Sequence, residues 1–246
     1  MTSRCLVFGG SGALGGAVCR ALAAGGARVA LTYHRGEGAA REVAEEVDAA
    51  LVLPLDLMSV EAIECAVDRA GDALGGLDAF VQCAGVGITT EPADRRTHAR
   101  MRAVDEGAWD RMLDVNTKST FFAVRRVADV MARGGGGNVV FIGSLDGVKP
   151  APSPVHYAAS KGALVGMTAA MAKELGQDRI RVNMVAPGIL ETGMSRDIPA
   201  ELLQEYVKHC GLKRLGRLGE VAGLVAWLAL HNTYVTGQVL LVDGAL

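Results

Sequence analysis

The order of apolar segments along the chain constrains its fold more than any other feature of the sequence. Short continuous runs rich in Val, Ile and Leu are typical of strands buried on both faces, and longer segments with helical spacing separate them. This alternation over the whole length predicts an α/β fold, with a parallel sheet and helices on both of its faces. The predicted strands are Cys5–Phe8, Arg28–Thr32, Leu51–Leu53, Ala79–Gln82, Asn138–Ile142, Arg181–Val185 and Gln238–Val242. The predicted helices are Ala13–Ala24, Gly38–Ala50, Val60–Leu74, Gly107–Ala132, Pro154–Leu175 and Leu218–Leu230.

The length and composition of the chain fit a single domain of this kind. Its 246 residues are 50% hydrophobic, which is enough to bury one large core, so we predict one domain over residues 1–246. Residues 189–212 interrupt the alternation with a long mixed stretch, which indicates a lid or a binding loop. A second irregular stretch, Val86–Glu106, has few apolar residues, and a solvated surface loop is the favoured interpretation. Its arginines are Arg95, Arg96, Arg100 and Arg102.

Charge, hydropathy and cysteine usage exclude several function classes. The net charge at pH 7 is −2, so the chain has no surplus of positive charge that would favour nucleic acid or an anionic membrane as a partner. No apolar run reaches the roughly 18 uncharged residues that a membrane crossing needs, and no signal-peptide pattern is present. The five cysteines are scattered without close pairs, so they predict neither disulfides nor a zinc site. We therefore expect a cytoplasmic protein without a bound metal.

A glycine-rich turn lies between the first predicted strand and the first predicted helix. Its sequence is Phe8-Gly-Gly-Ser-Gly-Ala-Leu-Gly-Gly16. Glycine permits a positive φ in a tight turn and lets the backbone approach a pyrophosphate, whose charge is favoured at a helix N-terminus. A glycine cluster alone could be a simple turn, but its position favours dinucleotide binding. The sequence thus predicts a Rossmann-type, doubly wound parallel β-sheet.

The end of the second predicted strand bears on the choice between NAD and NADP. NAD-binding chains place an acid about 20 residues after the glycines, where it bonds the ribose 2′-hydroxyl. Here His34 and Arg35 stand at that position, and the first acid is Glu37. An arginine can pair with a 2′-phosphate through two parallel hydrogen bonds, so NADP(H) is favoured over NAD(H). The alternative is that Arg35 merely begins the next loop in solvent.

Ser144, Tyr157 and Lys161 form a pattern that points to proton chemistry. Tyr157 and Lys161 are four residues apart in a predicted helix, so both side chains lie on one face. A nearby ammonium favours the phenolate and lowers the tyrosine pKa from about 10, which suits a proton donor or acceptor. Ser144 follows a predicted strand at the carboxyl edge of the sheet, where ligands bind. Singly, the three residues could be a core tyrosine, a surface lysine and a helix-capping serine.

Taken in order, these motifs resemble those of the short-chain dehydrogenase/reductases over essentially the whole chain. The resemblance implies that Tyr157 is the general acid in reduction, that Ser144 holds the substrate oxygen, and that Lys161 bonds the nicotinamide ribose. It also implies that Asn116 anchors a water in the proton relay. The matching blocks are the glycine turn, Leu55-Asp56-Leu57, Gln82-Cys83-Ala84-Gly85, Asn116, Ser144, Tyr157 with Lys161, Asn183, Pro187-Gly188, Thr192 and residues 238–244.

The same resemblance implies a set of cofactor contacts. Asp56 would meet the adenine, and Ile189 and Thr192 would contact the nicotinamide carboxamide, which places residues 189–212 over the substrate. The expected cofactor-binding residues are Gly9, Ser11, Gly12, Leu14, Gly15, His34, Arg35, Asp56, Leu57, Cys83, Ala84, Gly85, Tyr157, Lys161, Pro187, Gly188, Ile189 and Thr192.

The sequence departs from the family pattern at four places. Ala13 stands where many simple reductases have the middle glycine, and Gly12 replaces a basic residue that often helps to hold the NADP phosphate. Gln82-Cys83 replaces paired asparagines, so one side-chain hydrogen bond is expected to be missing. The Val86–Glu106 stretch is longer than in the simplest members, so their substrate preference does not transfer to this chain.

The resemblance implies an NAD(P)H-dependent carbonyl reductase with Tyr157 as the proton donor. Residues 216–222 and 235–239 are similar to the 3-oxoacyl-(acyl-carrier-protein) reductases, and also to sugar, steroid and polyketide reductases. The expected substrate is a small carbonyl compound or a carrier- or CoA-bound 3-oxoacyl thioester, and the arginines of Val86–Glu106 could meet an acidic carrier. One alternative is an alcohol, sugar or steroid dehydrogenase working oxidatively. A non-catalytic nucleotide-sensing scaffold is disfavoured, because all four catalytic positions are present.

The predicted helix Pro154–Leu175 is rich in alanine and glycine, which lets another helix approach closely. That packing could lie within one subunit. The family resemblance implies a homotetramer, or a homodimer, in which this helix and Gly107–Ala132 form one interface and the C-terminal strand forms another.

Overall fold

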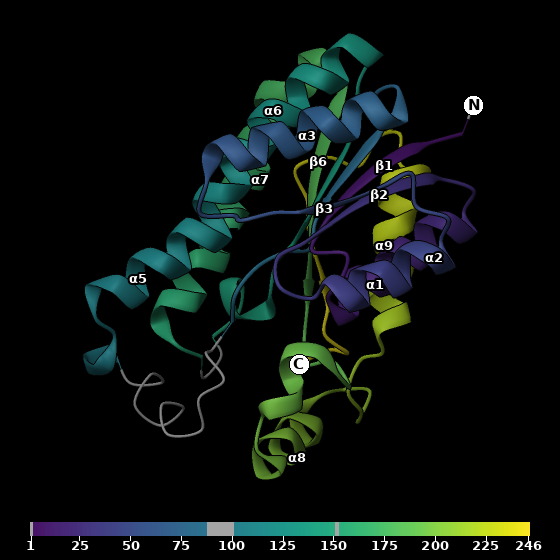
Figure 1. The fold of residues 1–246 in the computed structure, drawn as a ribbon. Helices are drawn as coiled ribbons and strands as arrows, with labels where there is room; N and C mark the ends of the chain where they lie inside the picture. Colours follow the sequence, from purple (N-terminus) through teal and green to yellow (C-terminus); the bar gives the residue numbers. More distant parts are fainter. Residues whose placement is uncertain (1, 88–100, 151–152) are drawn as a thin grey trace.

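A computed structural model describes residues 2–87, 101–150 and 153–246, and these contain a seven-stranded sheet (Figure 1). The strand order is β3-β2-β1-β4-β5-β6-β7, and all neighbouring strands are parallel. The chain winds outward from β1 to β3 and then from β4 to β7, which confirms the doubly wound sheet. The strands are β1 (Arg4–Phe8), β2 (Arg28–Tyr33), β3 (Leu51–Pro54), β4 (Ala79–Gln82), β5 (Gly137–Ile142), β6 (Ile180–Pro187) and β7 (Val239–Val242).

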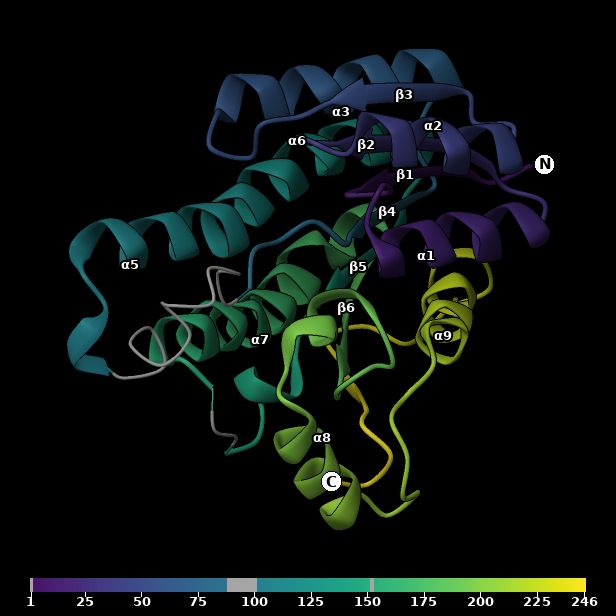
Figure 2. The ribbon, with the colours of Figure 1, turned by 60° about the horizontal axis from the view of Figure 1, so that its bottom comes forward.

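Helices cover both faces of the sheet, as Figures 1 and 2 show. One layer consists of α1 (Ala13–Ala24), α2 (Glu37–Glu46) and α9 (Leu218–Leu230). The other layer consists of α3 (Val60–Leu74), α6 (Ser119–Gly134) and α7 (Val155–Leu175).

Alternate side chains of each central strand enter opposite halves of the core. In β1, Leu6 and Phe8 belong to the cluster under α3, α6 and α7, whereas Cys5 and Val7 belong to the cluster under α1 and α9. All four side chains are fully buried. This is the period-two alternation of a strand with helices on both sides, and it explains why such strands are continuously apolar in sequence.

The predicted helix Gly107–Ala132 is interrupted in the structure. It consists of α5 (Glu106–Leu113), a π-helical turn over Asp114–Lys118, and α6. The Ser119 N–H closes the turn on the Asp114 carbonyl, five residues back instead of four. Because the hydrophobic spacing on either side is helical, the sequence pattern does not reveal this extra residue.

The 189–212 stretch contains more regular structure than a loop. A 3-10 helix over Gly193–Asp197 precedes α8 (Ala200–His209), which starts directly after Pro199. Proline is tolerated at a helix start, because the missing N–H would have no partner in the helix. Of the Val86–Glu106 stretch, residues 88–100 lie outside the described residues, and so do Arg95, Arg96 and Arg100. Arg102 is exposed in a short 3-10 helix over Met101–Ala103.

Three further expectations concern membranes, disulfides and metals. None of the helices in the described part of the chain has the length and apolar character needed to cross a membrane. The five cysteines are free thiols. Among the described residues, no three His, Cys, Asp or Glu side chains are grouped closely enough to hold a metal ion.

Candidate active site

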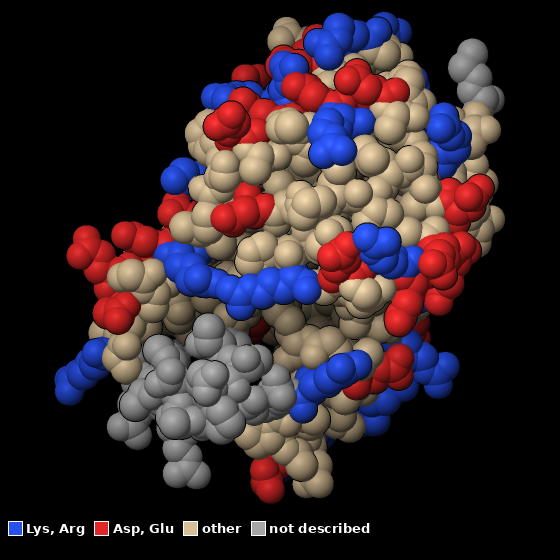
Figure 3. All heavy atoms as spheres, in the orientation of Figure 1, with Lys and Arg blue, Asp and Glu red and all other residues tan. Residues whose placement is uncertain are grey.

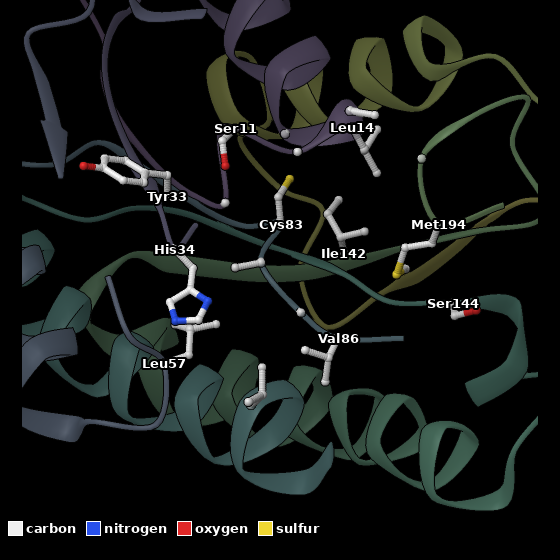
Figure 4. A pocket seen from close by; sticks show the side chains of 18 of the residues that line it. Ser11, Leu14, Tyr33, His34, Leu57, Cys83, Val86, Ile142, Ser144 and Met194 are labelled. Carbon is white, nitrogen blue, oxygen red and sulfur yellow. The ribbon is translucent and has the colours of Figure 1, made fainter. Parts of the chain in front are cut away.

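A cleft of about 620 Å³ lies at the carboxyl ends of the strands, where the strand order reverses between β1 and β4. The size suits a small-molecule or cofactor site. In Figure 3 the surface is hollowed below a row of Lys and Arg side chains. Figure 4 shows Ser11 and His34 at one end of the cleft and Ser144 and Met194 at the other, with Cys83 between them.

The cleft contains the predicted catalytic residues Ser144, Tyr157 and Lys161 and most of the predicted cofactor residues. The predicted residues that line it are Gly9, Ser11, Gly12, Leu14, Gly15, His34, Arg35, Asp56, Leu57, Cys83, Ala84, Gly85, Ser144, Tyr157, Lys161, Pro187, Gly188 and Thr192. Ile189 does not line the cleft, and its N–H donates to the Tyr206 hydroxyl over 3.1 Å. Asn116 is buried and also lies outside the lining.

The glycine turn provides the close backbone packing that a pyrophosphate site needs. Gly9 has a φ of +81°, and a side chain there would place its Cβ 2.8 Å from the Ala84 backbone. A Cβ on Gly15 would overlap the Gly9 carbonyl oxygen. Gly12 is the N-cap of α1 and has no side chain to cap the helix, so the first N–H groups remain available for an anion. These residues therefore fit the diphosphate of a dinucleotide.

At the carboxyl end of β2, one end of the cleft is lined by basic side chains. Tyr33, His34 and Arg35 all line it, and Figure 4 shows the His34 ring above Leu57. Asp56 also lines this end, and its Oδ1 accepts the Met58 N–H at 2.9 Å. The carboxylate is therefore held by its own loop.

The three predicted catalytic side chains of the cleft are buried together at its other end. Ser144, Tyr157 and Lys161 are 8%, 7% and 5% exposed. Tyr157 and Lys161 lie one turn apart on α7, and Ser144 caps the 3-10 helix over Leu145–Gly147 that follows β5. Tyr157 lies close enough to Ser144 for the serine hydroxyl to lower the pKa of the phenol. Lys161 Nζ donates to the Ile142 carbonyl over 3.1 Å.

The pKa of Tyr157 differs from the sequence expectation. Burial raises the pKa of Tyr157 to about 12. The nearby Ser144 hydroxyl lowers this pKa, and the charge of Asp146 raises it. Lys161 Nζ lies 5.9 Å from the centroid of the tyrosine ring, and burial lowers its own pKa to about 8. Desolvation of the phenol therefore sets the direction of the shift, and the expected lowering of the Tyr157 pKa by Lys161 is not found.

Asn116 fixes the loop after β4 to α7. Its Oδ1 accepts the Val86 N–H at 2.8 Å, and its Nδ2 donates to the Val86 carbonyl at 2.9 Å and to Ser160 Oγ at 3.0 Å. A Cβ on Gly85 would lie 2.9 Å from the Asn116 carboxamide oxygen, so glycine is needed there. Asn116 itself lies, buried, in the π-helical turn.

Comparisons with known proteins bear on this arrangement. A family model described as enoyl-(acyl carrier protein) reductase matches residues 10–246. The 3-oxoacyl-(acyl-carrier-protein) reductase of Bos taurus is 34% identical over 246 residues, which span 100% of this chain and 98% of that protein. A short-chain dehydrogenase/reductase from Serratia marcescens superposes with a TM-score of 0.87 at 33% identity, over 99% of this chain and 97% of that one. The chain belongs to the short-chain dehydrogenase/reductase family.

Members of the short-chain dehydrogenase/reductase family are oxidoreductases that bind NAD(P), and the glycine turn described above fits that cofactor. A second relative, the 3-oxoacyl-(acyl-carrier-protein) reductase MabA of Mycobacterium tuberculosis, is 31% identical over 242 residues. The match covers 98% of this chain and 91% of that protein.

One departure from the short-chain dehydrogenase/reductase pattern has a visible result. Gln82 Nε2 donates to the Ala84 carbonyl over 3.2 Å, but the buried Gln82 Oε1 has no partner among the described residues. The neighbouring Cys83 lines the cleft, and burial raises the pKa of its thiol. The thiol is therefore neutral and adds no charge to the cofactor site.

The structure adds residues that the sequence reasoning did not select for this short-chain dehydrogenase/reductase. Arg111 of α5 and Met194 of the 3-10 helix line the cleft. Tyr206 of α8 connects this helix to the residues that follow β6 and β7, because its hydroxyl accepts the Ile189 N–H and donates to the Asp243 carbonyl over 3.3 Å. These contacts join segments that are far apart in the sequence, and no local motif marks them.

Proposed function

We propose that this short-chain dehydrogenase/reductase reduces a carbonyl group to an alcohol, with NADPH as the cofactor. The observation that carries the proposal is that the side chains of Ser144, Tyr157 and Lys161 are buried together at one end of a cleft that fits a dinucleotide. With a pKa of about 12, Tyr157 is protonated at neutral pH, and a proton donor is what a carbonyl oxygen requires during reduction.

Each residue of the site would have its own role in carbonyl reduction. The hydride that carbonyl reduction needs would come from the reduced nicotinamide, when it is bound. Tyr157 donates its phenolic proton to the carbonyl oxygen, and Ser144 holds that oxygen by a hydrogen bond. The Lys161 ammonium stabilises the phenolate that remains until solvent returns a proton. The α1 N-terminus and the glycine turn hold the pyrophosphate, which fixes the reactants in place.

The substrate class is tested with a panel of 3-oxoacyl thioesters, diketones and quinones, each with NADPH and with NADH. We propose a 3-oxoacyl thioester or a polyketide-type ketone, because the relatives named above are 3-oxoacyl-(acyl-carrier-protein) reductases. We expect NADPH oxidation with members of the first class. Tight cofactor binding without turnover of any carbonyl would contradict the proposed function.

The preference for NADP rests on the basic end of the cleft, and Arg35→Ala tests it. We expect KM for NADPH to rise about 10- to 150-fold, because a hydrogen bond to a charged group contributes about 1.5–3 kcal/mol. KM for NADH should change little, since NADH has no 2′-phosphate. The matched control is Arg41→Ala, which removes an exposed arginine that pairs with Glu37 at 2.6 Å on α2 and does not line the cleft. An equal rise for both cofactors would overturn the NADP assignment.

We also propose that the protein assembles as a homotetramer in the cytoplasm. Large apolar side chains are exposed on both expected interfaces, including Trp109 of α5 and Phe121 of α6 on one, and Leu241 of β7 on the other. Light scattering should give a mass about four times that of the 25.6-kDa chain. A stable monomer would remove the proposal.

A further inference from the structure

Arg196 holds the hydroxyl group of Thr192 at the start of the 3-10 helix over Gly193–Asp197. The Nε–H group of Arg196 donates to Thr192 Oγ1 over 2.9 Å. Thr192 lines the cleft, whereas Arg196 is exposed and is not among the lining residues. An effect of Arg196 on a ligand in the cleft would therefore pass through Thr192.

This contact leaves the Thr192 hydroxyl as a hydrogen-bond donor. A threonine hydroxyl has one hydrogen to donate and two lone pairs that accept. Arg196 occupies one lone pair, and the hydrogen has no acceptor among the described residues. The guanidinium beside the oxygen also polarises the O–H bond, because linked hydrogen bonds strengthen one another. The Thr192 hydroxyl is thus prepared to donate to an oxygen atom of a ligand.

Without Arg196, the Thr192 hydroxyl would have a competing use. Thr192 is the N-cap residue of the 3-10 helix and has an extended backbone. A threonine side chain at such a position commonly accepts an N–H of the first helical turn. Thr192 makes no such capping bond in the described structure. The contact with Arg196 therefore draws the hydroxyl away from the helix end, and its loss would let Thr192 turn back to cap the helix.

Thr192 belongs to the end of the cleft where the reaction would take place. Figure 4 shows Met194, two residues after Thr192, at the end of Ser144 and away from Ser11 and His34. A dinucleotide with its diphosphate at the glycine turn and its adenosine at the basic end would have its nicotinamide here. The polar group of that ring is a carboxamide, and its oxygen accepts hydrogen bonds.

We propose that Arg196 is a positioning residue, which orients the Thr192 hydroxyl as a donor to the carboxamide oxygen of the nicotinamide. The inference rests on the proposed function only through its cofactor, because it concerns the binding of the nicotinamide ring and neither the substrate nor the direction of the reaction. The sequence reasoning selected Thr192 and not Arg196, since only the folded turn joins the two side chains.

Two substitutions of Arg196 separate its hydrogen bond from the size of its side chain. Arg196→Gln places an amide nitrogen as far along the side chain as Nε and keeps a donor for Thr192, whereas Arg196→Met places a methyl group there. The dissociation constant for NADPH is measured by fluorescence titration, without turnover. We expect Arg196→Met to weaken NADPH binding about 2- to 13-fold, as for the loss of one hydrogen bond, and Arg196→Gln to keep most of the wild-type affinity. Wild-type affinity in Arg196→Met, or equally weak binding by both variants, would overturn the proposal.

A ligand without the nicotinamide ring identifies the part of the cofactor that depends on Arg196. 2′-Phospho-ADP-ribose keeps the diphosphate and the 2′-phosphate of NADPH but lacks the ring. Its dissociation constant should be the same in the wild type and in both Arg196 variants. An equal loss of affinity for both ligands in Arg196→Met would assign the contact to the diphosphate and overturn the carboxamide assignment. If the protein binds NADH more tightly than NADPH, NADH and ADP-ribose make the same comparison.

A double-mutant cycle tests whether Arg196 acts through Thr192. Thr192→Val removes the hydroxyl with little change in shape, and should weaken NADPH binding at least as much as Arg196→Met does. Once Thr192→Val is present, the further change Arg196→Met should have no effect, because the group that Arg196 orients is gone. Losses that add in the double variant would show that Arg196 acts independently of Thr192 and would contradict the positioning role.

Arg41→Met is the matched control, because Arg41 is an exposed arginine that pairs with Glu37 and does not line the cleft. Its NADPH binding and thermal unfolding should match the wild type. Thermal unfolding of Arg196→Met should also match, since the freed Thr192 hydroxyl can cap the helix. The expected affinities in a protein that reduces no carbonyl would support the role of Arg196 and reject the proposed function. A carbonyl reductase whose NADPH affinity does not depend on Arg196 would reject this inference alone.

Discussion

Replacing Tyr157 by phenylalanine should lower kcat/KM for carbonyl reduction by about 10²–10⁴-fold, the usual contribution of a positioned general acid. The ring keeps its place in the buried end of the cleft, and only the hydroxyl is lost. Since Ser144 is already held by Asp146, its position should be preserved. The loss should therefore fall on the chemical step, and not on folding.

The measurement combines steady-state kinetics at saturating NADPH with a fluorescence titration of the cofactor. The dissociation constant for NADPH should stay within a few-fold of the wild type, because the pyrophosphate site lies at the glycine turn. Tyr234→Phe is the matched control, because this tyrosine is 94% exposed and lies outside the cleft lining. A Tyr157→Phe rate within tenfold of the wild type would remove Tyr157 as the proton donor.

Gly15→Ala should have the second large effect, on cofactor binding and on stability. Its Cβ would overlap the carbonyl oxygen of Gly9, so the strand-to-helix turn has to open. Overpacking at such a site costs about 1–3 kcal/mol, which corresponds to a fall in Tm of about 2–12 °C for a chain of this length. The shifted N–H groups of the turn should weaken NADPH binding about 5- to 150-fold, by the same energy range.

The matched control is Gly223→Ala on α9. Nothing lies within 4 Å of a Cβ at that exposed helical position. Alanine there should leave NADPH binding unchanged and stabilise the protein by about 0.5–1 kcal/mol, because glycine loses more backbone entropy on folding. Calorimetry and isothermal titration of both variants make the comparison. Equal NADPH affinity in Gly15→Ala and the wild type would show that the turn does not contact the cofactor.

The sheet was predictable because its signal is local. Buried parallel strands are continuously apolar, and the seven predicted runs match β1 to β7 within two residues at each end. The glycine turn and the spacing of Tyr157 and Lys161 are also local patterns, and the structure brings both to one cleft. The position of an element along the chain was thus enough to place these residues at the carboxyl edge of the sheet.

The remaining features depend on contacts between distant segments. The raised pKa of Tyr157 comes from burial under several elements, whereas the sequence argument considered only Lys161 on the same helix. Helix α8 follows Pro199 in a mixed stretch, and Tyr206 ties it to residues that follow other strands. Asp146 carries no signal in sequence, because an acid near a serine is common and only the folded turn directs its carboxylate to Ser144.

The π-helical turn over Asp114–Lys118 has a consequence for the way this chain tolerates insertions and deletions. A turn whose hydrogen bond reaches five residues back contains one residue more than an α-helical turn. The segment from α5 to α6 is therefore a helix with one extra residue in it. Deleting a single residue from the turn would restore a continuous helix, and helix formation alone would favour that change. It would also rotate Asn116 away from Val86 and Ser160. The extra residue of the turn is therefore needed for the contacts of Asn116, and a variant that lacks it should lose them.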